Sequence, residues 1–186
     1  MTFSNAKRTF LTKLDRSKKG SIDLRAIPII QAINQTQNYY TTSSCSGRVY
    51  FWTGTGKKNQ TTWVKVSHDL IDESFFALTQ KEKEQDQIWL RCEPFIIHIA
   101  CKDIQAANAL LKNARLIFKK SSILTASSKV IVEIRDSSML EMPFYSNSQM
   151  VFSGDFAWLT EHINTMLEKT WEKTEILRKK IKENFL

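Results

Sequence analysis

The feature that most constrains this chain is a run of small polar residues that ends in a single arginine. Residues 41–48 read Thr-Thr-Ser-Ser-Cys-Ser-Gly-Arg, and aromatic residues flank the run on both sides. Side chains this small pack poorly and leave backbone amides accessible, so we expect the run to end a strand outside the core. Gly47 permits a positive φ, and the planar guanidinium of Arg48 suits a carboxylate or a phosphate. The run predicts an anion-binding turn; the alternative is a polar edge strand with a surface arginine.

Length and composition indicate one ordinary globular domain over residues 1–186. Hydrophobic residues make up 42% of the chain and charged residues 25%, as in a typical soluble domain. No apolar run approaches the roughly 20 residues that span a bilayer, and the first fourteen residues lack the apolar segment of a signal peptide. An odd number of cysteines, three, without a CxxC pair, and only three histidines argue against disulfides and against a metal site. We therefore predict a cytoplasmic protein with no membrane or metal partner.

Positive charge is concentrated in the first third of the chain. Residues 1–60 contain ten lysines and arginines but two acidic residues, whereas basic and acidic residues are equal in number over 61–186. The formal net charge of +8 therefore lies entirely in residues 1–60. A concentrated positive region favours a polyanionic partner, most commonly a nucleic acid.

Hydrophobic periodicity predicts an α+β (mixed α/β) domain with a mixed sheet flanked by helices and a long C-terminal helix. The Gly54-x-Gly56 pair follows a strand but precedes polar residues and another strand, so we interpret it as a hairpin that tolerates Asn, not as a Rossmann nucleotide loop. The predicted helices cover residues 5–14, 24–35, 70–79, 103–118 and 155–184. The predicted strands cover residues 39–45, 47–53, 61–67, 87–91, 95–101, 123–125, 129–135, 140–143 and 148–152.

Two histidines and one glutamate are further candidates for a polar site. His68 follows a predicted strand, where functional residues often gather, although a turn hydrogen bond would also account for it. Strand alternation places His98 on the face opposite Ile97 and Ile99, and its alternative role is that of a hydrogen-bonded core histidine. Glu93 can accept from an amine or a ribose hydroxyl, or it can form a salt bridge with a neighbouring basic residue.

Five segments carry a resemblance to a known family, in order over nearly the whole chain. They are residues 15–23, 40–48, 63–68, 90–99 and 141–143. The Ser-Ser-Cys-Ser-Gly-Arg run and the Glu-Pro-Phe-Ile-Ile-His run at residues 93–98 are its most specific parts. Through them the chain resembles the tRNA wybutosine-synthesizing protein 3 family.

The resemblance implies a methyltransferase outside the Rossmann fold that uses S-adenosylmethionine. Its implied substrate is the 7-(3-amino-3-carboxypropyl)-4-demethylwyosine base beside the anticodon of tRNA-Phe, methylated on the ring nitrogen N-4. From the resemblance and the residue chemistry we assign Ser44, Cys45, His68 and His98 as catalytic. We assign Ser43, Ser46, Gly47, Arg48 and Glu93 to the cofactor, and Lys13, Lys18, Lys19 and Lys119 to the tRNA.

One segment departs from the family pattern. Residues 117–123 read Ile-Phe-Lys-Lys-Ser-Ser-Ile, where the family usually has a Gly-Phe-Arg-x-Ser-Gly-Ile run. Two glycines are absent and Lys119 replaces an arginine, which matters if the turn needs a positive φ or a bidentate donor. Two other functions stay open: an RNA-binding module without catalysis, and a small-molecule-binding or scaffold protein.

Overall fold

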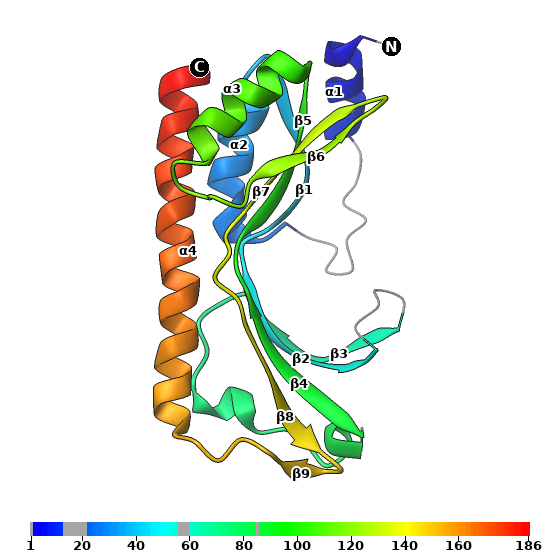
Figure 1. Cartoon of the computed structure of the whole chain (residues 1–186), viewed down its shortest axis with the longest axis vertical. Helices are drawn as coiled ribbons and strands as arrows, with labels where there is room; N and C mark the ends of the chain where they lie inside the picture. The colour runs from blue at the N-terminus through cyan, green and yellow to red at the C-terminus, as the bar shows by residue number, and fades with distance from the viewer. Residues whose placement is uncertain (1, 13–21, 56–59, 85) are drawn as a thin grey trace. The chain divides into compact units, whose positions relative to one another are not determined.

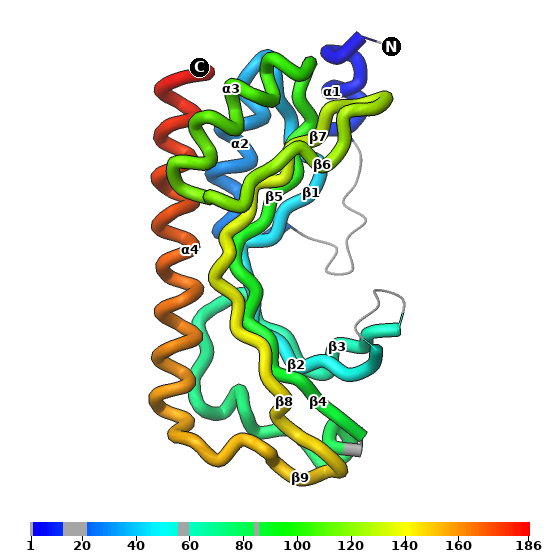
Figure 2. The backbone as a smooth tube through the Cα atoms, in the orientation of Figure 1, coloured from blue at the N-terminus to red at the C-terminus, as the bar shows by residue number. Residues whose placement is uncertain are grey.

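The computed structural model describes residues 2–12, 22–55, 60–84 and 86–186. It divides the chain into two compact units, each with its own antiparallel sheet. Unit 1 contains residues 1–46, 95–137 and 170–186, and unit 2 contains residues 47–94 and 138–169. The chain path through the two units can be followed in Figure 2.

The sheet of unit 1 has four strands in the order β1-β5-β7-β6. Figure 1 shows helices α2 and α3 on one side of this sheet and α1 on the other. Phe3 and Phe10 of α1 place their ring centroids 5.4 Å from that of Tyr40. The elements of unit 1 are α1 (Phe3–Leu11), a 3-10 turn (Leu24–Ala26), α2 (Ile27–Gln35), β1 (Tyr39–Cys45), β5 (Ile96–Cys101), α3 (Ile104–Ala114), β6 (Ser122–Ala126) and β7 (Val130–Arg135).

Alternation along the strands of unit 1 separates an apolar face from a polar one. Ile97, Ile99, Val132 and Ile134 are fully buried against α2, α3 and the C-terminal end of α4. Because successive side chains of a strand point to opposite faces, His98 and Glu133 lie on the other face. Helix α3 begins at a capped end, since Asp103 Oδ1 accepts from the amide of Ala106 at 2.8 Å.

The sheet of unit 2 has five strands in the order β3-β2-β4-β8-β9. Its buried face is aromatic: the ring of Phe51 lies 5.0 Å from that of Phe144 and 5.5 Å from that of Phe75. The elements are β2 (Arg48–Gly54), β3 (Thr61–Ser67), two 3-10 turns (Glu73–Phe76 and Glu82–Glu84), β4 (Gln87–Glu93), β8 (Leu140–Ser146) and β9 (Gln149–Met150). Helix α4 (Phe156–Phe185) contributes its first fourteen residues to unit 2 and the rest to unit 1.

The predicted α+β class and the long C-terminal helix are confirmed, and every strand pairing within the described ranges is antiparallel, unlike the parallel sheet of a Rossmann fold. In place of one mixed sheet there are two sheets. The chain passes from one sheet to the other at Gly47, whose φ is 104°, and at Pro94, which has no N–H to continue a ladder of strand hydrogen bonds. Hydrophobic periodicity does not predict either change of sheet.

The predicted helix over residues 70–79 is wrong. A single 3-10 turn forms at Glu73–Phe76, where Asp72 Oδ1 accepts from the amide of Ser74 at 2.9 Å. The turn ends at Ala77, whose backbone is extended. Phe75 and Phe76 are both buried, and adjacent side chains do not share one helix face. Among the described residues, no helix has the length and apolar character needed to cross a bilayer.

Candidate functional site

Ser46 is the last residue of the small-residue run that belongs to unit 1, and three hydrogen bonds hold it. Its amide and hydroxyl donate to Asp23 Oδ2 at 3.0 and 3.2 Å. Its carbonyl accepts from Trp171 Nε1 at 2.8 Å, and the guanidinium of Arg25 lies 3.7 Å from the ring centroid of Trp171. Ser46 is 2% exposed. The amide, hydroxyl and carbonyl of Ser46 therefore all bond within the protein, and its contact with the cofactor stays a prediction.

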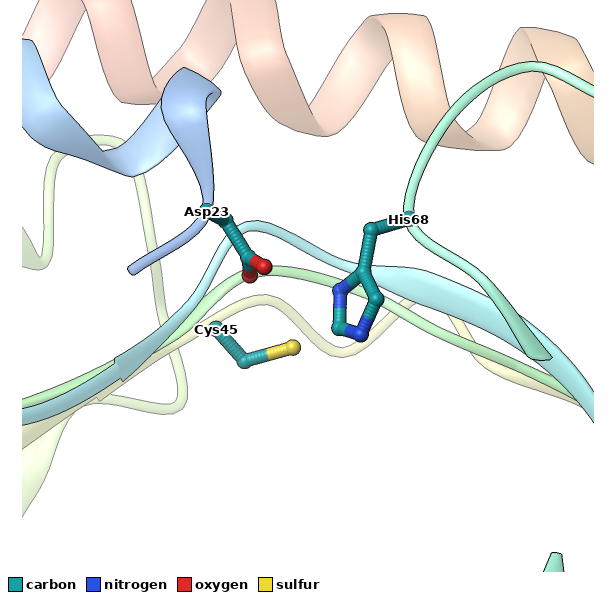
Figure 3. Close-up of side chains that lie close together, drawn as sticks. All are labelled: Asp23, Cys45 and His68. Atoms are coloured by element: carbon teal, nitrogen blue, oxygen red, sulfur yellow. The ribbon is translucent and has the colours of Figure 1, made fainter. Parts of the chain in front are cut away.

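Asp23 and Cys45 extend this arrangement beside the end of β1. Their side chains lie close together in Figure 3. Asp23 is buried, whereas the thiol of Cys45 is half-buried. His68, also drawn in Figure 3, follows β3 in unit 2 and is half-buried there, at the strand end where the sequence predicts it.

A line of polar side chains crosses three neighbouring strands of unit 1. Ser43 Oγ on β1 lies 2.9 Å from His98 Nδ1 on β5. His98 Nε2 lies 3.0 Å from Glu133 Oε2 on β7, and Arg135 Nε lies 3.2 Å from Glu133 Oε1. The register makes Ser43, His98 and Glu133 direct cross-strand neighbours, so the sheet itself aligns them.

The same register separates Ser44 from His98, although we predicted both residues as catalytic. Ser44 pairs with Ile97, whose side chain is buried under the helices, whereas Ser43 pairs with His98 on the opposite face. Ser44 is half-buried and Ser43 is exposed. Of the two serines, Ser43 is the one whose hydroxyl lies beside His98.

In unit 2, Arg48 is bound to Glu93 across β2 and β4. Arg48 Nε and Nη2 donate to Glu93 Oε2 at 2.9 and 2.7 Å, and the two residues are direct partners in the register. The salt bridge that the sequence left open for Glu93 is thus the one formed. The planar donors that we expected on a ligand face this carboxylate, and a role for Arg48 in ligand binding stays a prediction.

Aromatic and charged side chains continue along this face of unit 2. Arg48 Cζ lies 4.4 Å from the ring centroid of Trp63. Tyr50 Oη donates to Glu93 Oε1 at 2.8 Å and accepts from Arg91 Nη1 at 3.1 Å. Burial, followed by the charge of Glu93, raises the pKa of Tyr50 to about 12. Tyr50 therefore stays a neutral donor near pH 7.

The turn at residues 117–123, which lacks the two glycines of the family pattern, has no backbone conformation that requires glycine. Lys119 is exposed in the turn after α3. Ser121 Oγ donates to the carbonyl of Phe118 at 2.7 Å, and Arg115 Nε donates to the carbonyl of Ser121 at 2.9 Å. Among the described non-glycine residues, φ is positive at Asn147 and Ser148 and nowhere else. Lys13, Lys18 and Lys19, also predicted to contact tRNA, lie outside the described residues.

Sequence reasoning gave no site role to Asp23, Glu133 or Trp171. Asp23 is one of two acidic residues in the basic first third of the chain, which is a usable signal. Glu133 interrupts the apolar run Val-Ile-Val-Glu-Ile on β7, and a buried-strand pattern with one carboxylate is a second signal. Trp171 is one of the apolar residues at helical spacing near the C-terminus, a pattern that predicts core packing. Nothing in the sequence indicates its hydrogen bond to Ser46.

Comparison with known proteins identifies the class. A family model described as "Methyltransferase TYW3" matches residues 5–183. The chain is 35% identical over 181 residues to a Methanocaldococcus jannaschii protein named tRNA(Phe) 7-((3-amino-3-carboxypropyl)-4-demethylwyosine(37)-N(4))-methyltransferase, covering 92% of this chain and 93% of that protein. It is 33% identical over 171 residues to the Xenopus laevis tRNA wybutosine-synthesizing protein 3 homolog, covering 86% of this chain and 66% of the relative.

A solved structure agrees with these sequence matches. The PH1069 protein from Pyrococcus horikoshii superposes with a TM-score of 0.88 at 30% identity, covering 100% of this chain and 97% of the other. The family match thus defines a methyltransferase, here with a fold built on two antiparallel sheets. The chain belongs to the TYW3 methyltransferase family.

Proposed function

We propose that this chain methylates N-4 of the 7-(3-amino-3-carboxypropyl)-4-demethylwyosine base of tRNA-Phe, with S-adenosylmethionine as the methyl donor. The observation that carries the proposal is the family match over residues 5–183, together with 35% identity over nearly the full length of the M. jannaschii enzyme of that name. The concentrated positive charge of residues 1–60 supports a nucleic-acid substrate.

One described feature in each unit supports a bound cofactor. Ser43 of unit 1 offers an exposed hydroxyl, and Gly47 of unit 2 adopts a φ of 104° that a side chain would disfavour. S-adenosylmethionine, when bound, supplies an electrophilic methyl group on a cationic sulfur. The protein's part is to hold donor and acceptor in line and to exclude water.

We assign the positioning of this turn to Asp23 and Trp171. Their three hydrogen bonds to Ser46 fix the backbone immediately before Gly47. A fixed turn lowers the conformational entropy that is lost when a ligand binds. Ser43, Cys45, Arg48, His68 and Glu93 stay proposed contacts of cofactor or substrate.

The direct test is methyl transfer to tRNA-Phe that carries the demethylwyosine base. We expect the purified chain with S-adenosylmethionine to replace one hydrogen of that base by a methyl group, detected by mass spectrometry of the isolated nucleoside. Ser43→Ala should retain the fold by circular dichroism and lose most of the activity. Wild-type protein that binds this tRNA without methylating it would instead favour the RNA-binding module.

Isothermal titration calorimetry with S-adenosylmethionine tests the cofactor separately. We expect binding by the wild type and its loss in Gly47→Val, because a β-branched side chain both resists positive φ and fills the space beside the turn. A folded Gly47→Val variant with unchanged affinity would place the cofactor elsewhere.

A further inference from the structure

Ser43, His98 and Glu133 form a continuous line of polar contacts across the sheet of unit 1. Ser43 is exposed, whereas the side chains of His98 and Glu133 are 28% and 16% exposed. The line thus begins at solvent or ligand and ends at a carboxylate sheltered by the sheet. The three side chains come from three strands, so backbone pairing holds them in place.

The chemistry of the three groups sets the direction of the hydrogen bonds. An ionised carboxylate only accepts, so Glu133 Oε2 accepts from His98 Nε2. In a neutral imidazole the other nitrogen then has a lone pair, and His98 Nδ1 accepts the hydroxyl proton of Ser43. Ser43 Oγ therefore presents its lone pairs to whatever binds above it.

Methylation at N-4 needs such an acceptor. The demethylated base has a hydrogen where the product has a methyl group, so the transfer releases one proton. As the nitrogen forms its bond to the methyl carbon, the carbon–sulfur bond breaks and its electron pair neutralises the sulfonium. The remaining N–H proton must leave for the product base to be neutral.

We propose that Ser43, His98 and Glu133 form the proton relay of this reaction, an inference that rests on the proposed function. Ser43 Oγ accepts the N-4 proton while its own hydroxyl proton passes to His98 Nδ1. The imidazolium that results faces the Glu133 carboxylate. Ser43 contacts the substrate, and His98 and Glu133 are positioning residues that act through it.

The charged groups next to His98 support this direction. Glu133 lies on one side and the uncharged Ser43 on the other, and Arg135 reaches the line through Glu133 Oε1. The ion pair between Arg135 Nε and Oε1 holds the carboxylate from the side away from His98. Helix α1 places Phe3 and Phe10 over Tyr40 on this side of the sheet.

Glu133→Gln separates the relay from a structural role. In this variant Arg135 favours the amide oxygen, which turns the amide NH₂ toward His98 Nε2. His98 must then accept at Nε2 and carry its proton on Nδ1, so Ser43 can no longer pass a proton to it. The fold keeps the same volume and the same partners, and the tautomer changes.

Two measurements decide the proposal. We expect ¹⁵N–¹H spectra of the imidazole to show His98 protonated on Nε2 in the wild type and on Nδ1 in Glu133→Gln, with His162 of α4 unchanged as an internal reference. We expect the single-turnover methylation rate of Glu133→Gln to fall about 100-fold, with S-adenosylmethionine affinity within about twofold of wild type.

The double variant Glu133→Gln/Arg135→Leu is a rescue test. Without Arg135 the amide can turn its oxygen to His98, so the rate should rise at least about tenfold above that of Glu133→Gln.

Glu175→Gln is the matched control, since Glu175 also accepts from an arginine, Arg178, but lies on α4. It should change neither readout. A switched tautomer with an unchanged rate overturns the relay, and an unswitched tautomer overturns the role of Glu133. Wild-type protein that fails to methylate the tRNA overturns the proposed function and the relay's substrate, while the spectra still report its geometry.

Discussion

Arg48 and Glu93 face each other across β2 and β4, and both donors from Arg48 reach the same oxygen of Glu93. The other oxygen of Glu93 accepts from Tyr50. Arg48 also stacks on Trp63 at 4.4 Å. The guanidinium that ends the small-residue run is therefore held by one carboxylate and one aromatic face of its own unit.

Arg48→Lys keeps the charge and loses both the planar donor pair and most of the stacking. We expect the free energy of unfolding to fall by about 1 kcal/mol, measured by urea denaturation, since the pair is partly exposed. Methyl transfer should fall at least about tenfold. Unchanged stability and activity would show that a point charge is sufficient at this position.

The three cysteines should differ in reactivity. Burial raises the pKa of Cys92 and of Cys101 to about 12, whereas Cys45 is half-buried. Because the thiolate is the reactive form, we expect iodoacetamide at pH 8 to modify Cys45 in the native protein and all three thiols in urea. Peptide mass spectrometry measures this, and rapid native labelling of Cys92 would contradict it.

The same two thiols predict a loss of stability at high pH. A folded-state pKa above the unfolded value favours the protonated, folded form, so this contribution is present below the unfolded pKa. It is lost as pH rises from about 9 toward 12. Urea denaturation of Cys92→Ala should show a shallower decline over this range than the wild type, and equal slopes would refute the assignment.

Trp171→Phe removes the hydrogen bond to the Ser46 carbonyl and keeps an aromatic ring beneath Arg25. We expect a loss of about 1 kcal/mol in unfolding free energy, because a partly buried acceptor loses its donor. Methyl transfer should also fall, since the turn before Gly47 loses an anchor. Trp158→Phe is the control, as Trp158 is 57% exposed, and equal effects in both variants would argue against the anchor.

Gly54 should not tolerate substitution, contrary to the expectation from its hairpin context. Its φ is 115°, and an added Cβ would lie 1.9 Å from the backbone oxygen of Gln60. We expect Gly54→Ala to destabilise the protein by about 1–3 kcal/mol. Thermal denaturation measures this loss of stability. At Gly154 an added Cβ meets ring atoms of Phe152, whose half-buried side chain can turn, so Gly154→Ala should destabilise the protein less than Gly54→Ala does.

The basic residues before Asp23 predict how salt acts on tRNA binding. Lys13→Gln, Lys18→Gln and Lys19→Gln together should reduce the slope of log affinity against log salt by about one for each phosphate that the variant no longer neutralises. Single-turnover chemistry at saturating tRNA should stay near wild type. Filter binding over a salt series measures the slope, and an unchanged slope would place the tRNA on another surface.

The sequence predicted those parts of the fold that local patterning controls. The amphipathic helices, the positive φ of Gly47 and the outward face of His98 all follow from periodicity or from the absence of a side chain. Which strands pair is set by contacts between distant segments, so the division into two sheets could not be read from the chain. The helix expected at residues 70–79 failed because a capping Asp72 and two adjacent buried phenylalanines favour a single turn.

The candidate site shows the same division. Residue chemistry singled out both Ser43 and His98, and the register makes them neighbours; their roles stay predictions. It could not show that Ser44 faces the opposite side, because the irregular register between Thr41 and Ser43 decides which serine meets His98. Nor could it choose between a ligand and Glu93 for Arg48, since that depends on β2 lying beside β4.

Unit 1 is built from three separate segments of the chain, and this order affects how the protein folds during translation. Unit 2 has all its residues once residue 169 has left the ribosome, but unit 1 also needs residues 170–186. Leu177 and Ile181 of that last segment are at most 1% exposed, against α2, α3 and the sheet that carries Ser43 and His98. The core beneath this sheet therefore stays open until residues 177–181 have left the ribosome, and a nascent chain arrested before residue 177 should be cut by protease in unit 1 before unit 2.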